Sequence, residues 1–261
     1  MTKTVHEILQ QIDHRPWPLP TGPWVMTQQW CDLLFAHWPI PVEVMRTLVP
    51  AQLPLDTWDG MAWIGVVPFR MQGVRPRLTP ALPWLSAFPE LNVRTYVKLY
   101  DRDQEKAGVY FFSLEAANPV AVIVARTFFK LPYFRAAMAL REDHAGIHYT
   151  SRRTHRHAPP AEFVGNYWPV AEPYRAQPHT IDRWLTERYA LYTLDRRGRP
   201  YIGEIHHIPW PLQPAAAALQ TNTMTLASGL ALPATAPLLH FAHHLDVAIW
   251  PLRPVEERGA S

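Results

Sequence analysis

Four polar side chains alternate along residues 90–97 at the spacing that places them on one face of a β-strand. Successive side chains of a strand point to opposite faces, so Glu90, Asn92, Arg94 and Tyr96 share a face. The other face is apolar enough to pack against a second core layer and consists of Leu91, Val93, Thr95 and Val97. An acid, an amide, a base and a phenol can satisfy one another's hydrogen bonds when buried. Two interpretations stay open: the polar face meets water, or it lines a ligand cavity.

Two cations follow a continuous apolar run at residues 120–125. We expect residues 121–129 to form a strand buried on both faces, where a cation needs a partner. Arg126 would either form a structural ion pair or bind an anionic ligand group. Lys130 has apolar neighbours, and a desolvated lysine can act as a Schiff-base nucleophile, although a strand-end lysine that reaches solvent is commoner. Glu115, at the end of the apolar strand before this run, joins the candidate binding residues.

Histidines raise the alternative of a metal site. His206 and His207 are adjacent, and His240, His244 and Asp246 share a face if their segment is a strand. No ligand spacing typical of a zinc site is present, so packing and hydrogen-bonding roles are favoured and no metal or other cofactor is expected. The single cysteine, Cys31, lies in an aromatic-rich segment and is interpreted as a core thiol rather than a nucleophile.

Composition favours one domain over residues 1–261, with a surface lead-in at 1–25 and a tail at 252–261. The chain is 48% hydrophobic, and 28 prolines against 11 glycines disfavour long helices. The net charge is +3, but the basic clusters at 152–157 and 196–199 lie in turn-like sequence, which favours solvated loops over a nucleic-acid surface. No apolar run approaches the ~18 residues that span a bilayer, and residues 1–12 lack a signal-peptide pattern. We therefore expect a cytoplasmic protein that binds neither nucleic acid nor membrane; homo-oligomerisation stays open.

The elements that must position these residues are mostly short strands. Hydrophobic patterning and turn residues predict strands at 30–38, 61–71, 90–99, 108–116, 121–129, 147–153, 162–169, 189–194, 201–207 and 240–250. Short helices are predicted at 41–49, 181–188 and 213–220. Many strands with few helices indicate a mostly β, β-rich α+β fold, either an antiparallel barrel or two packed sheets.

Taken together, segments spread over most of the chain resemble the YqjF-like family of bacterial proteins, within the acetoacetate decarboxylase-like superfamily. The matching segments are residues 35–38, 55–60, 90–97, 108–114, 125–133, 186–189, 205–212 and 246–247. The resemblance implies a cone-like antiparallel β-barrel with a closed interior pocket and a few short peripheral helices. It also implies that Glu90 corresponds to a pocket glutamate of the superfamily.

The residues of true acetoacetate decarboxylases do not all carry over. Those enzymes have an arginine followed six positions later by proline and two adjacent lysines, one of which lowers the pKa of the other. Arg126 and Pro132 match this spacing, but Tyr133 and Phe134 stand at the lysine positions, and Lys130 falls where glycine is usual. The family's Schiff-base machinery is therefore not expected here.

Two functions remain open at this level. The first is a lyase- or isomerase-type enzyme acting on a small oxo acid, with Glu90 as base, Tyr133 as acid or hydrogen-bond donor, and Lys130 as a variant nucleophile. The residues that would bind its substrate are Asn92, Arg94, Tyr96, Glu115 and Arg126. The second is a non-catalytic pocket that binds a small organic metabolite.

Overall fold

The computed structural model describes residues 4–80 and 86–256, and it is mostly β, as expected. The strands are β1 (Met26–Ile40), β2 (Ala62–Pro76), β3 (Phe88–Asp101), β4 (Gln104–Ala116), β5 (Tyr133–Asp143), β6 (Gly146–Arg153), β7 (Glu162–Pro169), β8 (Ala190–Leu194), β9 (Pro200–His206), β10 (Gln213–Asn222), β11 (Leu238–Ile249) and β12 (Arg253–Pro254). The α-helices are α1 (Val5–Leu9), α2 (Val42–Leu48), α3 (Pro119–Phe128) and α4 (Ile181–Thr186). None of the described helices has the length and apolarity to cross a membrane.

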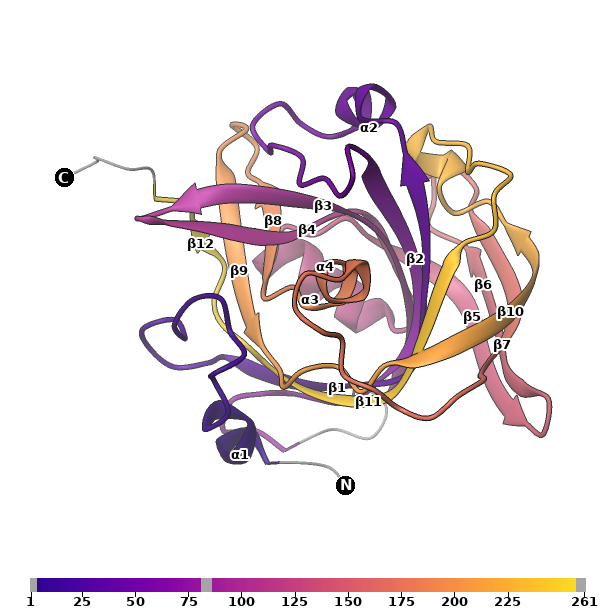
Figure 1. The fold of residues 1–261 in the computed structure, drawn as a ribbon, viewed down its shortest axis with the longest axis horizontal. Coiled ribbons are helices and arrows are strands. Elements are labelled where there is room, and N and C mark those ends of the chain that lie inside the picture. The colour runs from indigo at the N-terminus through magenta and orange to yellow at the C-terminus, as the bar shows by residue number, and fades with distance from the viewer. Residues whose placement is uncertain (1–3, 81–85, 257–261) are drawn as a thin grey trace.

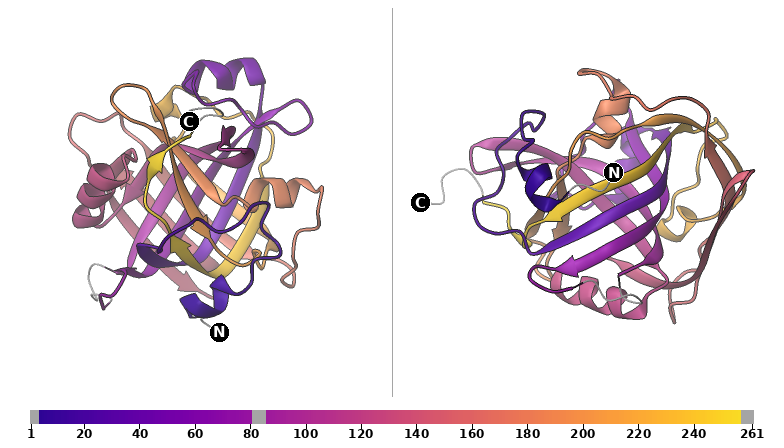
Figure 2. Two further views of the ribbon diagram at one scale, coloured as in Figure 1. Left: turned by 90° about the vertical axis from the view of Figure 1, so that its left-hand side faces the viewer. Right: turned by 90° about the horizontal axis from the view of Figure 1, so that it is seen from below.

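Hydrogen bonds join these strands into a sheet that closes on itself twice. One ring runs β9-β8-β4-β3-β2-β1-β11 and is closed by the β9–β11 pairing. The second ring shares β4, β3, β2, β1 and β11, continues through β10, β7, β6 and β5, and is closed by the β4–β5 pairing. In Figure 1 the layer of β5, β6, β7 and β10 lies beside the barrel. Helices α4 and α3 lie at its two opposite ends (Figures 1 and 2).

The strands common to both rings form a wall, and the two faces of this wall lie in different environments. On β3, Leu91, Val93 and Val97 belong to the core that fills the space between this wall and the β5–β6–β7–β10 layer. This arrangement confirms the predicted second core layer. The alternating residues Glu90 and Asn92 point away from that core, toward the interior of the first ring.

Between Cys31 and Ala36, strand β1 contains one residue more than the stretch of β2 that it pairs with. The register with β2 shifts between Cys31 and Ala36, and Asp32 has a φ of 52°, in the left-handed region that bulges often use. Before the bulge, the even-numbered residues Met26 and Trp30 face the first ring; after it, the odd-numbered Leu33 does. The extra residue therefore reverses which side chains of β1 face inward.

The predicted strand at 121–129 is wrong, because this segment forms helix α3. Asn118 caps the helix by accepting hydrogen bonds from the amides of Val120 and Ala121, at 2.9 and 3.2 Å, and Pro119 occupies the first turn, where its missing N–H costs nothing. The helix buries one side against the barrel end and leaves large apolar side chains such as Ile123 and Phe128 exposed. The apolar, partly β-branched run favours a strand locally, but the Asn-Pro start signal of a helix outweighs it.

The predicted helix at 213–220 is also wrong. The segment is strand β10, which pairs with β7 along most of its length and with β11 at Gln213 and Pro214. Its alanines favour a helix locally, but the pairing with strands on both sides overrides that propensity. Strand β5 was not predicted, since its alternating residues are small or charged. The other predicted strands and the helices near 41–49 and 181–188 are confirmed within a few residues.

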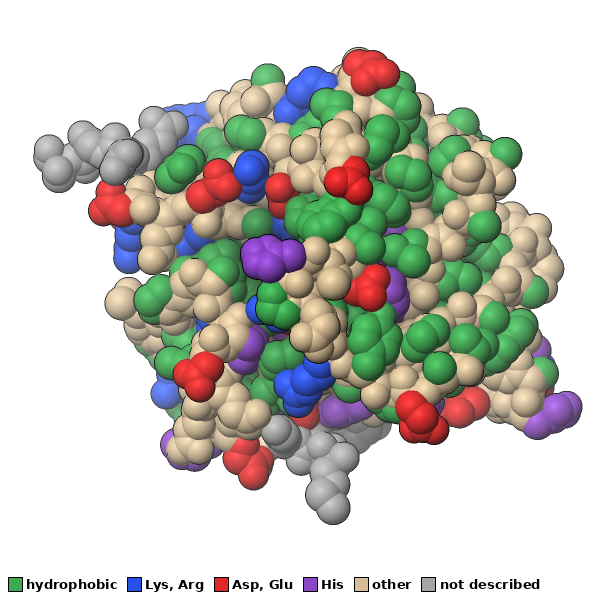
Figure 3. All heavy atoms as spheres, in the orientation of Figure 1, with side chains coloured by type: hydrophobic (Ala, Val, Ile, Leu, Met, Phe, Trp, Pro, Cys, Tyr) green, Lys and Arg blue, Asp and Glu red, His purple; other side chains and the backbone are tan. Residues whose placement is uncertain are grey.

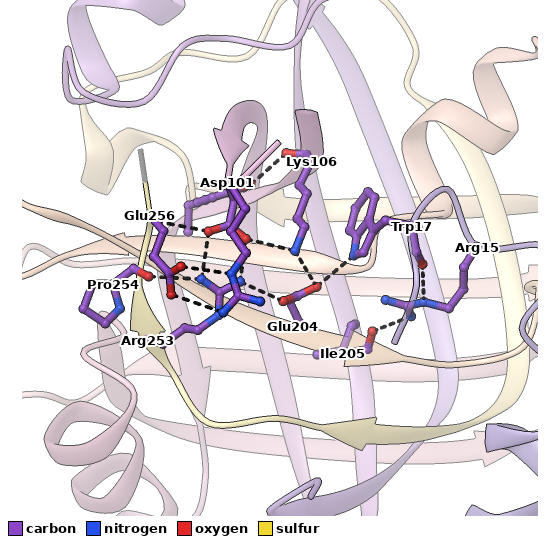
Figure 4. Close-up of polar contacts among 11 residues, drawn as sticks. Arg15, Trp17, Asp101, Lys106, Glu204, Ile205, Arg253, Pro254 and Glu256 are labelled. Atoms are coloured by element: carbon purple, nitrogen blue, oxygen red, sulfur yellow. Dashed lines mark hydrogen bonds and ion pairs between the residues drawn. The ribbon is translucent and has the colours of Figure 1, made fainter. Parts of the chain in front are cut away.

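A buried ionic cluster holds together segments that are distant in sequence (Figure 4). Lys106 Nζ lies 2.9 Å from Asp101 Oδ2 and 3.2 Å from Glu204 Oε1, and Arg253 contacts the same two carboxylates at 2.5 and 3.2 Å. Trp17 Nε1 donates to Glu204 Oε1 at 2.8 Å. Two cations balance two anions, and the cluster links the β3–β4 hairpin, β9, β12 and the lead-in.

On the surface that carries α4, acidic and basic side chains are interspersed (Figure 3).

Replacing Lys106 with Met should destabilise the fold by about 3 kcal/mol, because it leaves two buried carboxylates with a single cation. The matched control is Lys98→Met, which breaks an exposed pair with Glu105 and should cost less than about 1 kcal/mol. Urea unfolding of both variants measures the difference. Equal losses would show that the buried cluster contributes no more than a surface pair.

Candidate functional site

The first ring surrounds a cavity of about 170 Å³, and the residues that line it include members of α3 and the last residue of α4, Thr186. Most of its wall is apolar, with side chains from β1, β2, β3, β4, α3 and the segment after β9. The polar residues among those lining it are Gln28, Glu90, Asn92, Arg94, Tyr133, Thr186, Arg188 and His207, together with the indole groups of Trp30 and Trp210. A largely apolar cavity with a few convergent polar groups is the usual form of a small-molecule site.

Glu90 and Tyr133 form a buried acid pair in this cavity. The Tyr133 hydroxyl donates to Glu90 Oε2 at 2.9 Å, and Glu90 is only 2% exposed. Burial raises the pKa of Glu90 to about 8; the Tyr133 hydrogen bond opposes this rise and nearby Glu115 adds to it. Burial also raises the pKa of Tyr133 well above its usual value, so the phenol stays protonated. Near neutral pH, Glu90 can therefore both accept and return a proton.

Arg94 lies further along β3 and has no carboxylate partner among the described residues. Its Nη2 makes only long contacts, 3.5 Å to the Tyr96 hydroxyl and 3.4 Å to the Leu185 carbonyl, and its guanidinium packs over the rings of Phe35 and Tyr96. The Cα atoms of Glu90 and Arg94 are about 13 Å apart in an extended strand, with Asn92 between them. Three of the four predicted polar residues of this strand thus line one cavity.

Tyr96 is buried beyond Arg94 but does not line the cavity in the described structure. Its hydroxyl lies 2.6 Å from His37 Nε2. Burial lowers the pKa of His37 well below its usual value, and the neighbouring cation Arg94 adds to this effect, so the ring is neutral. Tyr96 and His37 therefore form a polar support beside Arg94.

Arg188 and His207 complete the polar part of the wall, with Trp210 beside them. Arg188 Nη1 donates to Asp56 Oδ2 at 2.5 Å and its Nε donates to the Trp184 carbonyl at 2.6 Å. Burial lowers the pKa of His207 to about 3, so its imidazole is neutral. The sequence analysis does not identify Arg188 or Trp210, and for His207 it weighs a metal role against the favoured packing and hydrogen-bonding role, without placing it in a ligand cavity. The signal available was their position in the segments 186–189 and 205–212 that resemble the family.

Arg126 and Lys130 lie outside the cavity, because the expected strand is helix α3. Both are exposed and line a separate surface depression with Arg196, Arg197 and Arg199. Arg126 Nη1 donates to the Tyr133 carbonyl at 2.7 Å, and Lys130 Nζ lies 4.5 Å from the centre of the Tyr201 ring. Lys130 is therefore exposed rather than desolvated, which matches the alternative of a lysine that reaches solvent. Arg126 contacts the backbone of a cavity residue rather than the cavity itself.

Glu115 is fully buried but forms an ion pair rather than a binding contact. Arg153 Nε donates to Glu115 Oε1 at 2.9 Å, and Arg153 Nη2 also contacts this oxygen. Ser113 donates to the other carboxylate oxygen at 3.1 Å. The predicted substrate contact by Glu115 does not match its position, since its oxygens already have partners and it does not line the cavity.

The histidines lie in separate places. His206 Nε2 lies 2.8 Å from the Ile8 carbonyl, and His240 Nε2 lies 3.1 Å from Asp182 Oδ1. On the outer side of the barrel, His244 lies 3.0 Å from Asp246 and 3.5 Å from Cys31 Sγ. Across residues 4–80 and 86–256, no three His, Cys, Asp or Glu side chains gather as a metal site would require.

The sequence of the chain matches a protein family and a bacterial protein over most of its length. The DUF2071 family, described as an uncharacterised conserved protein, matches residues 27–246. The chain is 48% identical to the uncharacterised protein YqjF of Bacillus subtilis (strain 168) over 235 residues, which are 90% of this chain and 94% of that protein.

Solved structures match in fold. The enduracididine biosynthesis enzyme MppR, in complex with pyruvate, superposes with a TM-score of 0.58 at 10% identity, over 92% of this chain and 93% of that one. Acetoacetate decarboxylase from Legionella pneumophila has a TM-score of 0.55 at 12% identity, over 98% of both chains. An acetoacetate decarboxylase-like enzyme from Sphingomonas wittichii has a TM-score of 0.57 at 14% identity, over 94% of this chain and 98% of that one. These likenesses confirm the acetoacetate decarboxylase-like fold.

Replacing Glu90 with Gln should change how stability depends on pH. The folded state keeps the Glu90 proton up to about pH 8, whereas the unfolded chain loses it near 4.5. The stability that this group contributes is full below about pH 4.5 and is lost as the pH rises toward 8, by up to about 5 kcal/mol. Urea unfolding at pH 5 and pH 8 should show Glu90→Gln gaining several kcal/mol on the wild type at the higher pH.

The matched control for this measurement is Glu105→Gln, which makes the same chemical change at an exposed carboxylate on β4. It should follow the wild type at both pH values. If Glu90→Gln also runs parallel to the wild type, Glu90 is not a buried, protonated acid.

Proposed function

The chain belongs to the DUF2071 family, and we propose that its cavity is the active site of a lyase- or isomerase-type enzyme that transfers protons on a small oxo acid. The observation that supports this is the buried Glu90–Tyr133 pair, in which a carboxyl group with a pKa of about 8 faces an apolar cavity. Catalytic acids and bases work best when their pKa lies near the working pH. The solved neighbour MppR, bound to pyruvate or to a condensation product of pyruvate, supports an oxo acid as the substrate class.

The proposed step is proton removal from the carbon next to the substrate carbonyl. The ionised Glu90 carboxylate takes the proton, so the C–H bond breaks, an O–H bond forms on Glu90, and the electron pair moves onto the carbonyl oxygen. The enolate oxygen accepts a hydrogen bond from the Asn92 amide. Once Glu90 carries the proton, the single O–H of Tyr133, which remains protonated, turns from Glu90 to the enolate oxygen and donates to it as well. Returning the proton to another position gives isomerisation, and expelling a leaving group gives elimination.

This chemistry does not need an imine. Tyr133 and Phe134 occupy the positions of the decarboxylase lysine pair, and among the described residues that line the cavity none is a lysine. Protonated tyrosine supplies a hydrogen bond where the decarboxylases supply a cationic amine, so the carbonyl is activated by hydrogen bonding rather than by covalent attachment.

A second candidate function is a non-catalytic binder of a small organic metabolite, and the large apolar share of the wall favours it. In a binder, Glu90 would act only as a neutral hydrogen-bonding group. Both candidates use the same cavity, so ligand binding alone does not separate them, whereas turnover does.

Deuterium exchange tests the enzyme directly. Wild-type protein in D2O should exchange the protons at C3 of 4-methyl-2-oxopentanoate, followed by proton NMR. The rate should rise with pH and level off above about 8, because the base must be ionised. Glu90→Gln should lower the rate about 100-fold or more, and Glu105→Gln should match the wild type. Binding of this acid without exchange above the buffer rate, in both the wild type and Glu90→Gln, would establish the binder instead.

Borohydride trapping addresses the covalent alternative. Incubation with pyruvate or 4-methyl-2-oxopentanoate followed by borohydride should give no adduct at Lys130, because its Nζ packs on Tyr201 outside the cavity. Peptide mass spectrometry reads the result. A reduced adduct at Lys130 would overturn the imine-free chemistry.

A further inference from the structure

The α4 end of the cavity holds more positive charge than the protein neutralises. Arg94 and Arg188 are both buried, at 8% and 6% exposed. Asp56 pairs with Arg188 alone, and no ion pair joins Arg94 to any carboxylate of residues 4–80 or 86–256. His37, beside Arg94, is neutral. Arg94 is therefore a buried cation without a counter-charge. Such a cation destabilises the folded protein far more than an exposed cation does, unless an anion binds to it.

Hydrogen-bond donors at the same end also lack acceptors. Arg94 Nε, Arg188 Nη2 and Trp210 Nε1 are buried without a partner, and all three residues line the cavity. Buried donors are nearly always satisfied in folded proteins. A carboxylate offers two oxygens with about four acceptor positions and is bound by arginine in a bidentate manner. The missing charge and the missing acceptors can therefore be supplied by one ligand group.

The α3 end of the cavity has the opposite character. Along β3 the inward residues run from Arg94 through Asn92 and Glu90 to Phe88, over about 20 Å of strand. Around Phe88 the wall is formed by Met71 on β2 and by Val124 and Ala125 on α3. A second ionised group on the ligand would meet apolar side chains there, and the described lining residues at this end include no cation to pair with it, which is unfavourable.

The size of the cavity limits the ligand. Its volume of about 170 Å³ is slightly larger than the ~150 Å³ of an apolar protein cavity that holds one benzene molecule. A ligand of roughly six to nine non-hydrogen atoms is therefore accommodated.

We infer that the ligand is a small monocarboxylate with an uncharged apolar chain of about five or six carbons, whose carboxylate binds Arg94 and Arg188 and whose chain points toward Phe88 and α3. The chain then extends along β3 from Arg94 toward Glu90 and Tyr133. The inference deepens the proposed function, on which it rests for the reaction but not for the binding.

Calorimetric binding of unreactive probes tests the inference. 4-Methylpentanoate should bind the wild type at least tenfold more tightly than 4-methylpentanamide, which has nearly the same shape without the charge. Within the carboxylates, affinity should rise about three- to fourfold per methylene from acetate to 4-methylpentanoate. Glutarate should bind more weakly than butanoate, because its second carboxylate meets the apolar end.

Arg94→Met gives the decisive variant, since it keeps an apolar side chain of similar length. It should abolish the preference for the acid over the amide. It should also unfold at the wild-type temperature or above, because an uncompensated buried charge is removed. The control Arg196→Met removes an exposed arginine and should keep the full preference.

The outcomes separate the two proposals. Equal binding of acid and amide by the wild type, or an unchanged preference in Arg94→Met, would overturn the carboxylate site even if Glu90-dependent exchange is found. A clear preference that Arg94→Met abolishes, together with no exchange in the wild type, would support the carboxylate site and remove the proposed reaction. A folded Arg94→Met that is strongly destabilised would show a structural role and also count against the inference.

Discussion

The alternation of side chains along β3 assigns the residues of one strand to two different environments. Leu91, Val93 and Val97 pack into the core beneath the β5–β6–β7–β10 layer, while Glu90, Asn92 and Arg94 line the cavity. Because the period of a strand is two residues, a shift of one position would exchange both sets at once. Pairing of β3 with β2 and β4 on its two sides fixes this register. The second layer thus makes the cavity possible, since it supplies the apolar partner that the outer face of the wall requires.

The buried charges of this protein fall into balanced and unbalanced groups. Lys106 and Arg253 face Asp101 and Glu204 (Figure 4), and Arg153 faces Glu115. These groups are neutral overall and join elements of the fold. In the cavity, by contrast, Glu90 is largely protonated near neutral pH and Arg94 has no carboxylate among the described residues. Buried polar groups that the fold leaves uncompensated mark the place where a ligand is expected to complete them.

Much of the fold could be predicted from the sequence, and the errors have a physical origin. The alternation at 90–97 is a local property, so the face shared by Glu90, Asn92 and Arg94 could be read directly. The segment after Asn118 carried conflicting local signals, and reading its β-branched residues as a strand placed Arg126 and Lys130 in the wrong environment. The ion pair of Glu115 could not be predicted for another reason: its partner Arg153 is distant in sequence, and nothing local indicates that pairing. Arg188 and Trp210 come from loops, whose course depends on the whole barrel.

The extra residue at Asp32 has a consequence for how this cavity could change over evolution. Strand β1 contributes even-numbered residues to the cavity on one side of the bulge and odd-numbered residues on the other. Loss or relocation of a single codon here would exchange a whole row of cavity side chains for residues that now face outward, including Cys31. A point substitution alters one contact at a time. In this strand an insertion or deletion is therefore the genetic event that would remodel ligand preference in one step, and length variation near Asp32 would separate relatives of differing specificity.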